Sequence, residues 1–548
     1  MFDIQLLKSF PVEVIYKILD QDFLSLRDVS NYLFNKSTHS VAQQILNERC
    51  LAHICVGKRR NYESVITSLY DNEVKRGPHY WHVYYNFTNS LQFANWLSTH
   101  NQFANFTIQI FIDQFEIEQL RVLKLLQGKN LKIYLNWEDE DSNTVSKFSH
   151  VIWPSLGEIF DLVNNRVKLV LEYENVIDLP MTFDLDNLVS FEWRYYYSTG
   201  QRIELASGLN TAHNTLEKII INSMNRMPLD IVLNTPFPNL TDFIVKSPLS
   251  EPQGTCRLLS KCPRLKTLVL HSTYFGDIAG FLQSVAPTGL QKLKTLELCN
   301  NRLGHIEGID FSRYFPSLQN LTIKFENGSP HHRFEFKNIV LPSTLRTLNL
   351  QAKRLISFNV IKGPSYLFKL DLSYNNPVSY KFDNTFEEIS ILNLSYNRSI
   401  LSSIYRFDLF HIADFIFFKV EELHLQGCNI NNEDLEALAS KYHYTTNDST
   451  TFPLPLCKLR KLNLSNNKLT NLRCFNNHLF RNMKSLTYLD LSFNAFYYLN
   501  DDNFPLLCEN YPNLLTINLT GNSRLNSVKL NEGYPKLETM YTPVKQNY

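Results

Sequence analysis

A short frame of apolar positions recurs along most of the chain: L-x-x-L-x-L, followed three positions later by Asn. Its clearest copy contains Leu459, Leu462, Leu464 and Asn467. Copies begin at residues 188, 216, 240, 265, 293, 318, 345, 367, 389, 420, 459, 486, 514 and 537. Eleven of the thirteen successive spacings lie between 22 and 28 residues. One copy alone is weak evidence, but fourteen in near-regular register indicate a repeat architecture.

The residue types of the frame explain how it would fold. The second and third leucines alternate on a short strand and point inward, and the Asn turns the chain while its amide satisfies backbone groups of neighbouring coils. One coil cannot bury its leucines alone, so coils must stack. The sequence predicts an α/β fold over residues 188–548. This is a leucine-rich-repeat solenoid with a curved parallel β-sheet on the concave side and helices and loops on the convex side.

The length of each repeat predicts what covers the convex side. Units of 22 residues leave room for a tight connection, whereas units of 27 or 28 residues allow a short helix. Leu435 and Leu438 have the spacing of one helical face. Cys428 stands where other repeats have Asn, as in the cysteine-containing variety of repeat. The polar stretch 442–456 is expected to be an exposed loop.

The N-terminal third carries a weaker pattern. Alternating apolar runs occur at 83–85, 106–112, 131–135 and 167–171, and helical patterns at 115–126 and 156–163 separate them. This spacing predicts degenerate repeats over residues 61–187, with the solenoid beginning near residue 80. Residues 1–60 lack the frame and show helical periodicity instead, which predicts a small helical N-terminal module.

That N-terminal module resembles an F-box. Residues 10–19 are similar to its opening, usually Leu-Pro-x-Glu followed by an apolar helix, and residues 28–30 are similar to its later Val-Ser element. The whole chain resembles the fungal F-box-type leucine-rich-repeat proteins. The sequence departs from that pattern at Phe10, where Leu is usual, and in the stretch from Leu19 to Val29, which is several residues shorter.

The resemblance implies a function. In that family the F-box binds a Skp-type adaptor of a cullin ubiquitin ligase, while the solenoid holds a protein substrate. The implied adaptor-binding residues are Phe10, Pro11, Glu13, Ile15, Ile18 and Val29. Two alternatives remain: the module only caps the first apolar face of the solenoid, or the chain is a regulatory scaffold with a vestigial F-box and no ubiquitin role.

A partner would contact residues between the strand leucines. The row between the second and third leucine is mostly Asn or Asp in the C-terminal repeats, but it is apolar at Ile220, Ile244 and Val269. Contiguous apolar side chains on a solvent face often mark a contact surface. We expect these three, flanked by Arg194, Lys246 and His271, to form the partner-binding patch. Alternatively, a segment of this same chain folds over them.

Composition and motifs narrow the classes of partner and of chemistry that the chain could have. Lys plus Arg total 54 and Asp plus Glu total 53, a balance that favours neither nucleic acid nor membrane as a partner. None of the nine cysteines is paired with C-x-x-C spacing, and no phosphate-binding loop or zinc-protease motif occurs. We therefore expect no catalytic residues, no metal site and no cofactor. Charged residues near the N-terminus and the lack of a long apolar segment predict an intracellular protein, cytoplasmic or nuclear.

Overall fold

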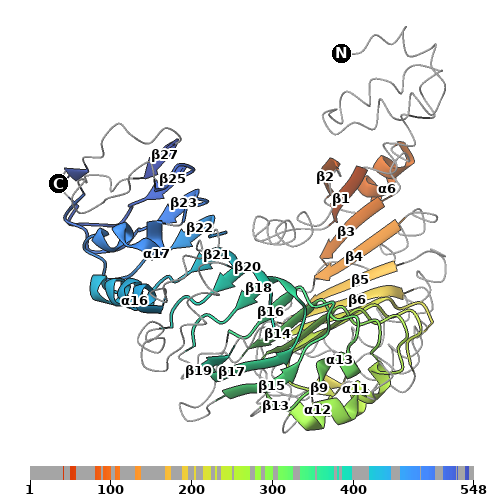
Figure 1. Cartoon of the computed structure of the whole chain (residues 1–548). Coiled ribbons are helices and arrows are strands. Elements are labelled where there is room, and N and C mark those ends of the chain that lie inside the picture. Colours follow the sequence, from red (N-terminus) through yellow and green to blue (C-terminus); the bar gives the residue numbers. More distant parts are fainter. Residues whose placement is uncertain are drawn as a thin grey trace, which may run out of the picture. The chain divides into compact units, whose positions relative to one another are not determined.

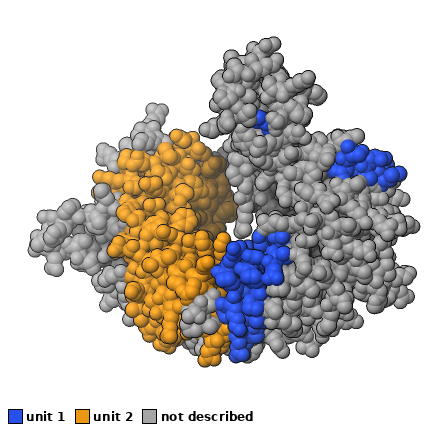
Figure 2. All heavy atoms as spheres, turned by 90° about the vertical axis from the view of Figure 1, so that its right-hand side faces the viewer, with its two compact units in different colours: residues 1–265 blue, residues 266–548 orange. Residues whose placement is uncertain are grey.

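The leucine frames fold into short parallel strands, and the computed structural model is a parallel β-solenoid of the leucine-rich-repeat type (Figure 1). The structure describes residues 41, 50–56, 81–87, 90–99, 105–111, 130–136, 167–173, 188–195, 203–204, 214–223, 229–230, 236–249, 252–271, 278–285, 290–299, 306–324, 334–351, 355–375, 379–381, 385–397, 419–445, 457–481, 483–499, 510–525, 527–528 and 537–541. The chain divides into two units, residues 1–265 and 266–548, which Figure 2 shows in separate colours. The boundary between them falls inside the repeat array.

In the first unit, eight described strands form one parallel sheet. Their spatial order is β2–β1–β3–β4–β5–β6–β8–β10. The strands are β1 (Cys50–Val56), β2 (Trp81–Phe87), β3 (Asn105–Phe111), β4 (Asn130–Asn136), β5 (Val167–Tyr173), β6 (Leu188–Tyr195), β8 (Lys218–Ser223) and β10 (Asp242–Lys246). The apolar runs expected as degenerate repeats coincide with β2 to β5, so those strands are confirmed. The helical patterns expected at 115–126 and 156–163 lie outside the described residues.

The sheet begins earlier than the sequence indicated. β1 pairs in parallel with β2 from Cys50 to Val56 and with β3 from Leu51 to Val56. The expected start near residue 80 is therefore wrong. β1 carries no leucine frame, and it lies between two strands that follow it in the chain, so the repeat spacing could not reveal it.

In the second unit, eleven described strands form a parallel sheet in chain order. They are β11 (Thr267–His271), β12 (Thr295–Cys299), β14 (Asn320–Lys324), β16 (Thr347–Asn349), β18 (Tyr366–Asp371), β20 (Glu388–Asn393), β21 (Val420–His424), β22 (Lys461–Asn463), β23 (Tyr488–Asp490), β25 (Thr516–Asn518) and β27 (Thr539–Tyr541). Across both units, each of the fourteen frames found in the sequence starts within two residues of the start of a strand of these sheets.

Shorter strands and helices occupy the connections. β13 (Ile306–Glu307), β15 (Phe334–Val340), β17 (Leu355–Lys362) and β19 (Ser379–Lys381) form a second parallel sheet, and β24 (Tyr498–Leu499) with β26 (Ser527–Val528) and β7 (Ile203–Glu204) with β9 (Leu229–Asp230) form two-stranded pairs. The helices are α6 (Ser90–Thr99), α11 (Pro252–Leu259), α12 (Ile278–Ser284), α13 (Phe311–Tyr314), α16 (Asn432–Thr445) and α17 (His478–Arg481), with the 3₁₀ turn η5 (Arg473–Asn476).

The helix expected around Leu435 and Leu438 is confirmed as α16, and both leucines are buried. α16 continues to Thr445, so residues 442–445 are helical and the loop expected from residue 442 is wrong at its start. The helix persists there because Lys441 to Thr445 contains neither Gly nor Pro to end it. The rest of that expected loop lies outside the described residues.

The core consists of the frame leucines. Leu459, Leu462 and Leu464 are each at most 1% exposed, and the described equivalent residues of the other frames are buried, except Leu537, which is half-buried. Burying one such side chain stabilises the fold by about 1.5–3 kcal/mol. Because each coil supplies one layer, stability grows by stacking. We refer to the face of each main sheet opposite these leucines as its outer face.

Candidate binding surface

In the first unit, the predicted isoleucines lie side by side on the outer face. Ile220 of β8 is in register with Ile244 of β10 on one side and with Glu192 of β6 on the other. All three side chains are half-buried, while the alternating neighbours, such as Ile219 and Ile221, are fully buried. The period of two along a strand therefore separates a core face from an outer face that carries an apolar pair.

The next row of the first unit is polar. Arg194, Asn222 and Lys246 are in register on β6, β8 and β10. Lys246 is exposed and Asn222 is half-buried, whereas the side chain of Arg194 lies outside the described residues. The backbone thus places two of the predicted flanking cations in one row beside Ile220 and Ile244.

Val269 and His271 belong to the second unit, on β11. Val269 is only 6% exposed and is in register with Glu297 of β12. The expectation that Val269 is exposed is wrong, because β11 buries three consecutive residues, Leu268 to Leu270, on both of its faces. His271, by contrast, is half-buried. The structure therefore brings Ile220 and Ile244 together, and Val269 does not extend them as an exposed position.

In the second unit, six strands carry Asn or Asp at the position between the second and third leucine of the frame, close to the end of the strand. Each Asn or Asp of this row accepts a hydrogen bond from the backbone N–H two residues later, in the manner of an Asx turn. The bonds measure between 2.9 and 3.1 Å for Asn349, Asp371, Asn393, Asn463, Asp490 and Asn518. These side chains are thus part of the scaffold, a role beyond the polar lining that the sequence suggested.

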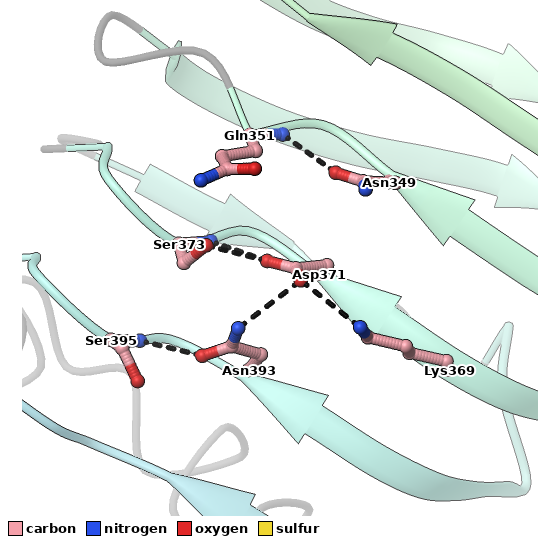
Figure 3. A network of polar contacts seen from close by, with 7 residues as sticks. All are labelled: Asn349, Gln351, Lys369, Asp371, Ser373, Asn393 and Ser395. Atoms are coloured by element: carbon pink, nitrogen blue, oxygen red, sulfur yellow. Dashed lines mark hydrogen bonds and ion pairs between the residues drawn. The ribbon is translucent and has the colours of Figure 1, made fainter. Parts of the chain in front are cut away.

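The carboxylate of Asp371 links its own coil to the next one through this row (Figure 3). Its Oδ1 accepts hydrogen bonds from the backbone N–H of Ser373 at 3.1 Å and from the Ser373 hydroxyl at 2.6 Å. Its Oδ2 accepts from Asn393 Nδ2 at 3.1 Å and lies 3.3 Å from Lys369 Nζ. The carboxylate is only 9% exposed, so these partners compensate its loss of hydration.

His424 interrupts the Asn and Asp row. It lies in register between Asn393 and Asn463. Burial lowers the pKa of its imidazole, Lys369 and Lys461 act in the same direction, and Glu422 and Asp371 oppose them. The neutral imidazole is therefore favoured at this position.

Buried asparagines connect successive coils behind the row. Asn467 Nδ2 donates to the carbonyls of Leu464 in its own coil and Leu425 in the previous coil, both at 2.9 Å, while its Oδ1 accepts from Ile430 N at 3.0 Å. The same donation to two coils is made by Asn375, Asn397, Asn494 and Asn522. Cys428 takes the place of Asn and donates its thiol to the Leu394 carbonyl at 3.2 Å.

The residue immediately before each of these buried asparagines, and before Cys428, adopts a left-handed backbone conformation. φ lies between 52° and 71° for Tyr374, Tyr396, Gly427, Asn466, Phe493 and Gly521. Since only glycine adopts this region without cost, four of the six coils hold a strained residue there. The rings of Tyr374 and Tyr396 stack with centroids 4.4 Å apart and planes inclined by 15°.

His271, Glu297 and Cys299 form a cluster that the sequence did not reveal. Glu297 Oε1 lies 2.9 Å from His271 Nε2 and accepts a hydrogen bond from Cys299 Sγ at 3.4 Å. The hydrogen bond with His271 is the main cause that holds the pKa of Glu297 below its usual value, against an opposing effect of burial. The repeat alignment contains a signal for this cluster: His271 and Cys299 occupy the same position in successive repeats, so they lie in register on neighbouring strands.

The residues implied by the F-box resemblance are Phe10, Pro11, Glu13, Ile15, Ile18 and Val29, and all of them lie outside the described residues. Their role as an adaptor-binding surface stays a prediction. Within the part of the chain that the structure describes, no helix is long and apolar enough to cross a membrane.

Comparison with known proteins agrees with the repeat architecture. No protein-family model matches the chain. Over 190 residues the chain is 27% identical to the immunoglobulin domain and leucine-rich repeat-containing protein 2 of Caenorhabditis elegans. The match covers 33% of this chain and 19% of that protein, so the chain spans about a fifth of the relative's length. The relative and the fold together identify a leucine-rich-repeat solenoid, and nothing in them shows an F-box or a fungal origin.

Proposed function

We propose that this protein is a non-catalytic scaffold that binds another protein through the outer face of its first unit. A repeat solenoid fits a protein-binding role because it presents an extended sheet whose outer residues vary without harm to the core. The observation that carries the proposal is the apolar pair Ile220 and Ile244. These two half-buried side chains stand in register, at positions where six strands of the second unit have an Asn or Asp side chain that bonds to its own backbone.

The surroundings of the pair have the character of a binding surface. Glu192 continues the row on one side, and the row of Arg194 and Lys246 runs beside it. An apolar centre with charged residues at its rim is the common organisation of a protein interface. The pair would supply burial on binding, and the charges would select among partners.

The proposal also includes a purpose for the binding: delivery of the bound protein to a ubiquitin ligase. The residues from Phe10 to Leu19 and the later Val29 resemble an F-box, and this resemblance supports a substrate receptor that joins its bound protein to a Skp-type adaptor and a cullin ubiquitin ligase. Such a receptor would act inside the cell.

A regulatory scaffold without a ubiquitin role is the second candidate. Two observations favour it: Phe10 replaces the usual Leu and the segment from Leu19 to Val29 is short. The similar worm protein is named for immunoglobulin domains and repeats. In this second candidate, the module of residues 1–60 caps the solenoid.

The two parts of the proposal are tested with the full chain. For the ligase link, purified protein is titrated with a purified Skp-type adaptor, and the variant Ile15→Asp/Ile18→Asp is compared with it. Binding that the variant loses supports the receptor. No binding by the unmodified chain establishes the regulatory scaffold instead.

For the contact surface, tagged full-length protein is cross-linked in cells and its partners are identified by mass spectrometry. The variant Ile220→Asp/Ile244→Asp should lose the partners that cross-link to β8 and β10. Ile361→Asp is the matched control, because Ile361 is 59% exposed on β17 of the other unit. Unchanged partners in the double variant would show that the pair is not the contact surface.

A further inference from the structure

The cluster on β11 and β12 brings three different metal-binding side chains to one face. His271 and Cys299 are in register at the ends of the two strands, and Glu297 lies two residues before Cys299. Because side chains alternate along a strand, Glu297 and Cys299 project to the same face, and His271 projects to it from the neighbouring strand. Strand pairing, which is rigid, therefore sets the positions of all three side chains.

The ligand atoms are already close to the arrangement that an ion requires. His271 Nε2, Glu297 Oε1 and Cys299 Sγ all lie within 4.8 Å of one another. The two shorter separations are 2.9 Å from nitrogen to oxygen and 3.4 Å from sulfur to oxygen. Zinc lies about 2.0–2.3 Å from N, O and S ligands, so tetrahedral ligand atoms are about 3.3–3.8 Å apart. Shifts of a few tenths of an ångström to about one ångström would accommodate it.

The donor set selects the class of metal. Calcium and magnesium take oxygen ligands almost exclusively, whereas an imidazole, a thiolate and a carboxylate together suit zinc. Three protein ligands leave one tetrahedral position open, as in zinc sites that accept water or another ligand. We propose that His271, Glu297 and Cys299 form a zinc site on the outer face of the second unit.

The environment of the cluster supports this assignment. Cys299 is only 1% exposed and lies at the back of the site, while the side chains of His271 and Glu297 are 22% and 32% exposed. An ion could therefore enter from solvent, and the fourth ligand would come from the same side.

Binding has a defined proton balance. In the metal-free chain the Cys299 thiol keeps its proton and donates a hydrogen bond to Glu297. Zinc binding replaces both hydrogen bonds to Glu297 with bonds to the metal. The thiol proton of Cys299 is released to solvent, and the neutral His271 ring coordinates through Nε2 in the tautomer that carries its proton on Nδ1. The proposal needs no binding partner and no F-box, so its test is independent of the proposed function.

The test uses the metal-free full chain, titrated with zinc chloride by calorimetry and compared with His271→Ala, Glu297→Gln and Cys299→Ser. The unmodified chain should bind one equivalent more than each variant at micromolar zinc. Each substitution should weaken that site at least about 100-fold, since even partners of metal ligands are typically worth about 10- to 100-fold. His424→Ala and Cys457→Ser are matched controls from outside the cluster and should keep the equivalent.

Cobalt(II) supplies a second, spectroscopic readout that reports directly on a thiolate ligand. A thiolate-to-cobalt charge-transfer band should appear with the unmodified chain and disappear in Cys299→Ser. Circular dichroism and thermal unfolding without metal establish that each variant is folded. Equal zinc stoichiometry in the unmodified chain and the three variants, or no thiolate–cobalt band in the unmodified chain, would overturn the proposal.

Discussion

The aromatic ring of Tyr396 lies against the α-carbon of Gly427 in the next coil, so that a Cβ on Gly427 would come within 2.6 Å of two ring carbons. Phe493 covers Gly521 in the same way. Both glycines also have positive φ. At these two places the ring on one coil leaves room only for glycine on the coil after it, which ties together residues 31 positions apart at Tyr396 and Gly427.

Gly427→Ala should therefore destabilise the protein for two separate reasons. The left-handed backbone costs alanine about 1–2 kcal/mol, and the contact with the Tyr396 ring should add about 1–3 kcal/mol of overpacking strain. The free energy of unfolding, measured by urea denaturation monitored by circular dichroism, checks the sum.

Gly308→Ala is the matched control, because Gly308 has a φ of 68° but a Cβ at this position would meet no atom within 4 Å. It should show only the backbone cost. Adding Tyr396→Ala to Gly427→Ala should recover part of the extra loss. Equal losses for Gly308→Ala and Gly427→Ala would contradict the steric explanation.

Asn467→Ala should be among the more destabilising single substitutions on the second unit. It leaves the carbonyls of Leu425 and Leu464 without this donor and Ile430 N without its acceptor, all in a buried region. Each buried polar group left unsatisfied costs about 1–3 kcal/mol, so a loss of at least about 2 kcal/mol in urea denaturation is expected. Asn320→Ala serves for comparison, because Asn320 makes a single 3.3 Å bond to the half-buried Thr295 hydroxyl. A loss no larger than that of Asn320→Ala would show that water replaces the amide.

His424→Asn should remove part of the acid sensitivity of the fold. The pKa of His424 is lowered in the folded chain, chiefly by burial, from an ordinary value of 6.5. Below pH 6.5 the unfolded chain therefore binds a proton that folded His424 resists, and stability falls as pH decreases toward the folded pKa. Above pH 6.5 the imidazole is neutral in both states, and this loss of stability does not occur.

The stability of the Asn variant should thus depend less on pH below 6.5, while the difference between the two proteins stays constant at higher pH. Asparagine also occupies the neighbouring positions, Asn393 and Asn463, so the variant fits the row. Urea denaturation across this range checks it, and parallel curves for the two proteins would refute the assignment to His424.

Buried cysteines should resist alkylation until the chain unfolds. Burial raises the pKa of Cys428 and of Cys474 to about 12 each, and that of Cys457 to about 11. Relative to an ordinary 9.0, a pKa of about 12 lowers the thiolate fraction at neutral pH by about 1,000-fold, and the thiolate is the reactive form. Peptide mapping after iodoacetamide treatment, with and without urea, measures the labelling of each cysteine. Rapid labelling of Cys428 or Cys474 in the folded protein would contradict their burial.

The leucine frame was sufficient to predict the main sheets because it states which residues face the core and at what spacing. Leu462 and its equivalents are buried wherever the frame occurs in described repeats. The sheet formed by β13, β15, β17 and β19 escaped prediction, since its strands lie in the connections, outside the leucine frame on which the prediction rested. β1 escaped prediction because it carries no leucine frame, and because it lies between β2 and β3, both of which follow it in the chain.

The surface was harder to predict than the core. The pairing of Ile220 with Ile244 followed from the repeat alignment, but Val269 did not have the exposure expected from its position. Exposure depends on the size of neighbouring side chains, which alternation alone does not encode. The cluster of His271, Glu297 and Cys299 was missed because metal motifs are usually sought within a few residues, whereas here the repeat period brings the ligands together.

The position of β1 between β2 and β3 has a mechanical consequence. A solenoid stacked strictly in chain order can be unzipped from its end, because the terminal strand has only one neighbour. Here a pulling force transmitted to β1 acts on a strand that is paired on both sides, through seven positions with β2 and six with β3. Detaching β1 must therefore break the hydrogen bonds of two strand pairs at once, so β1 should resist mechanical unfolding more than a strand with one neighbour.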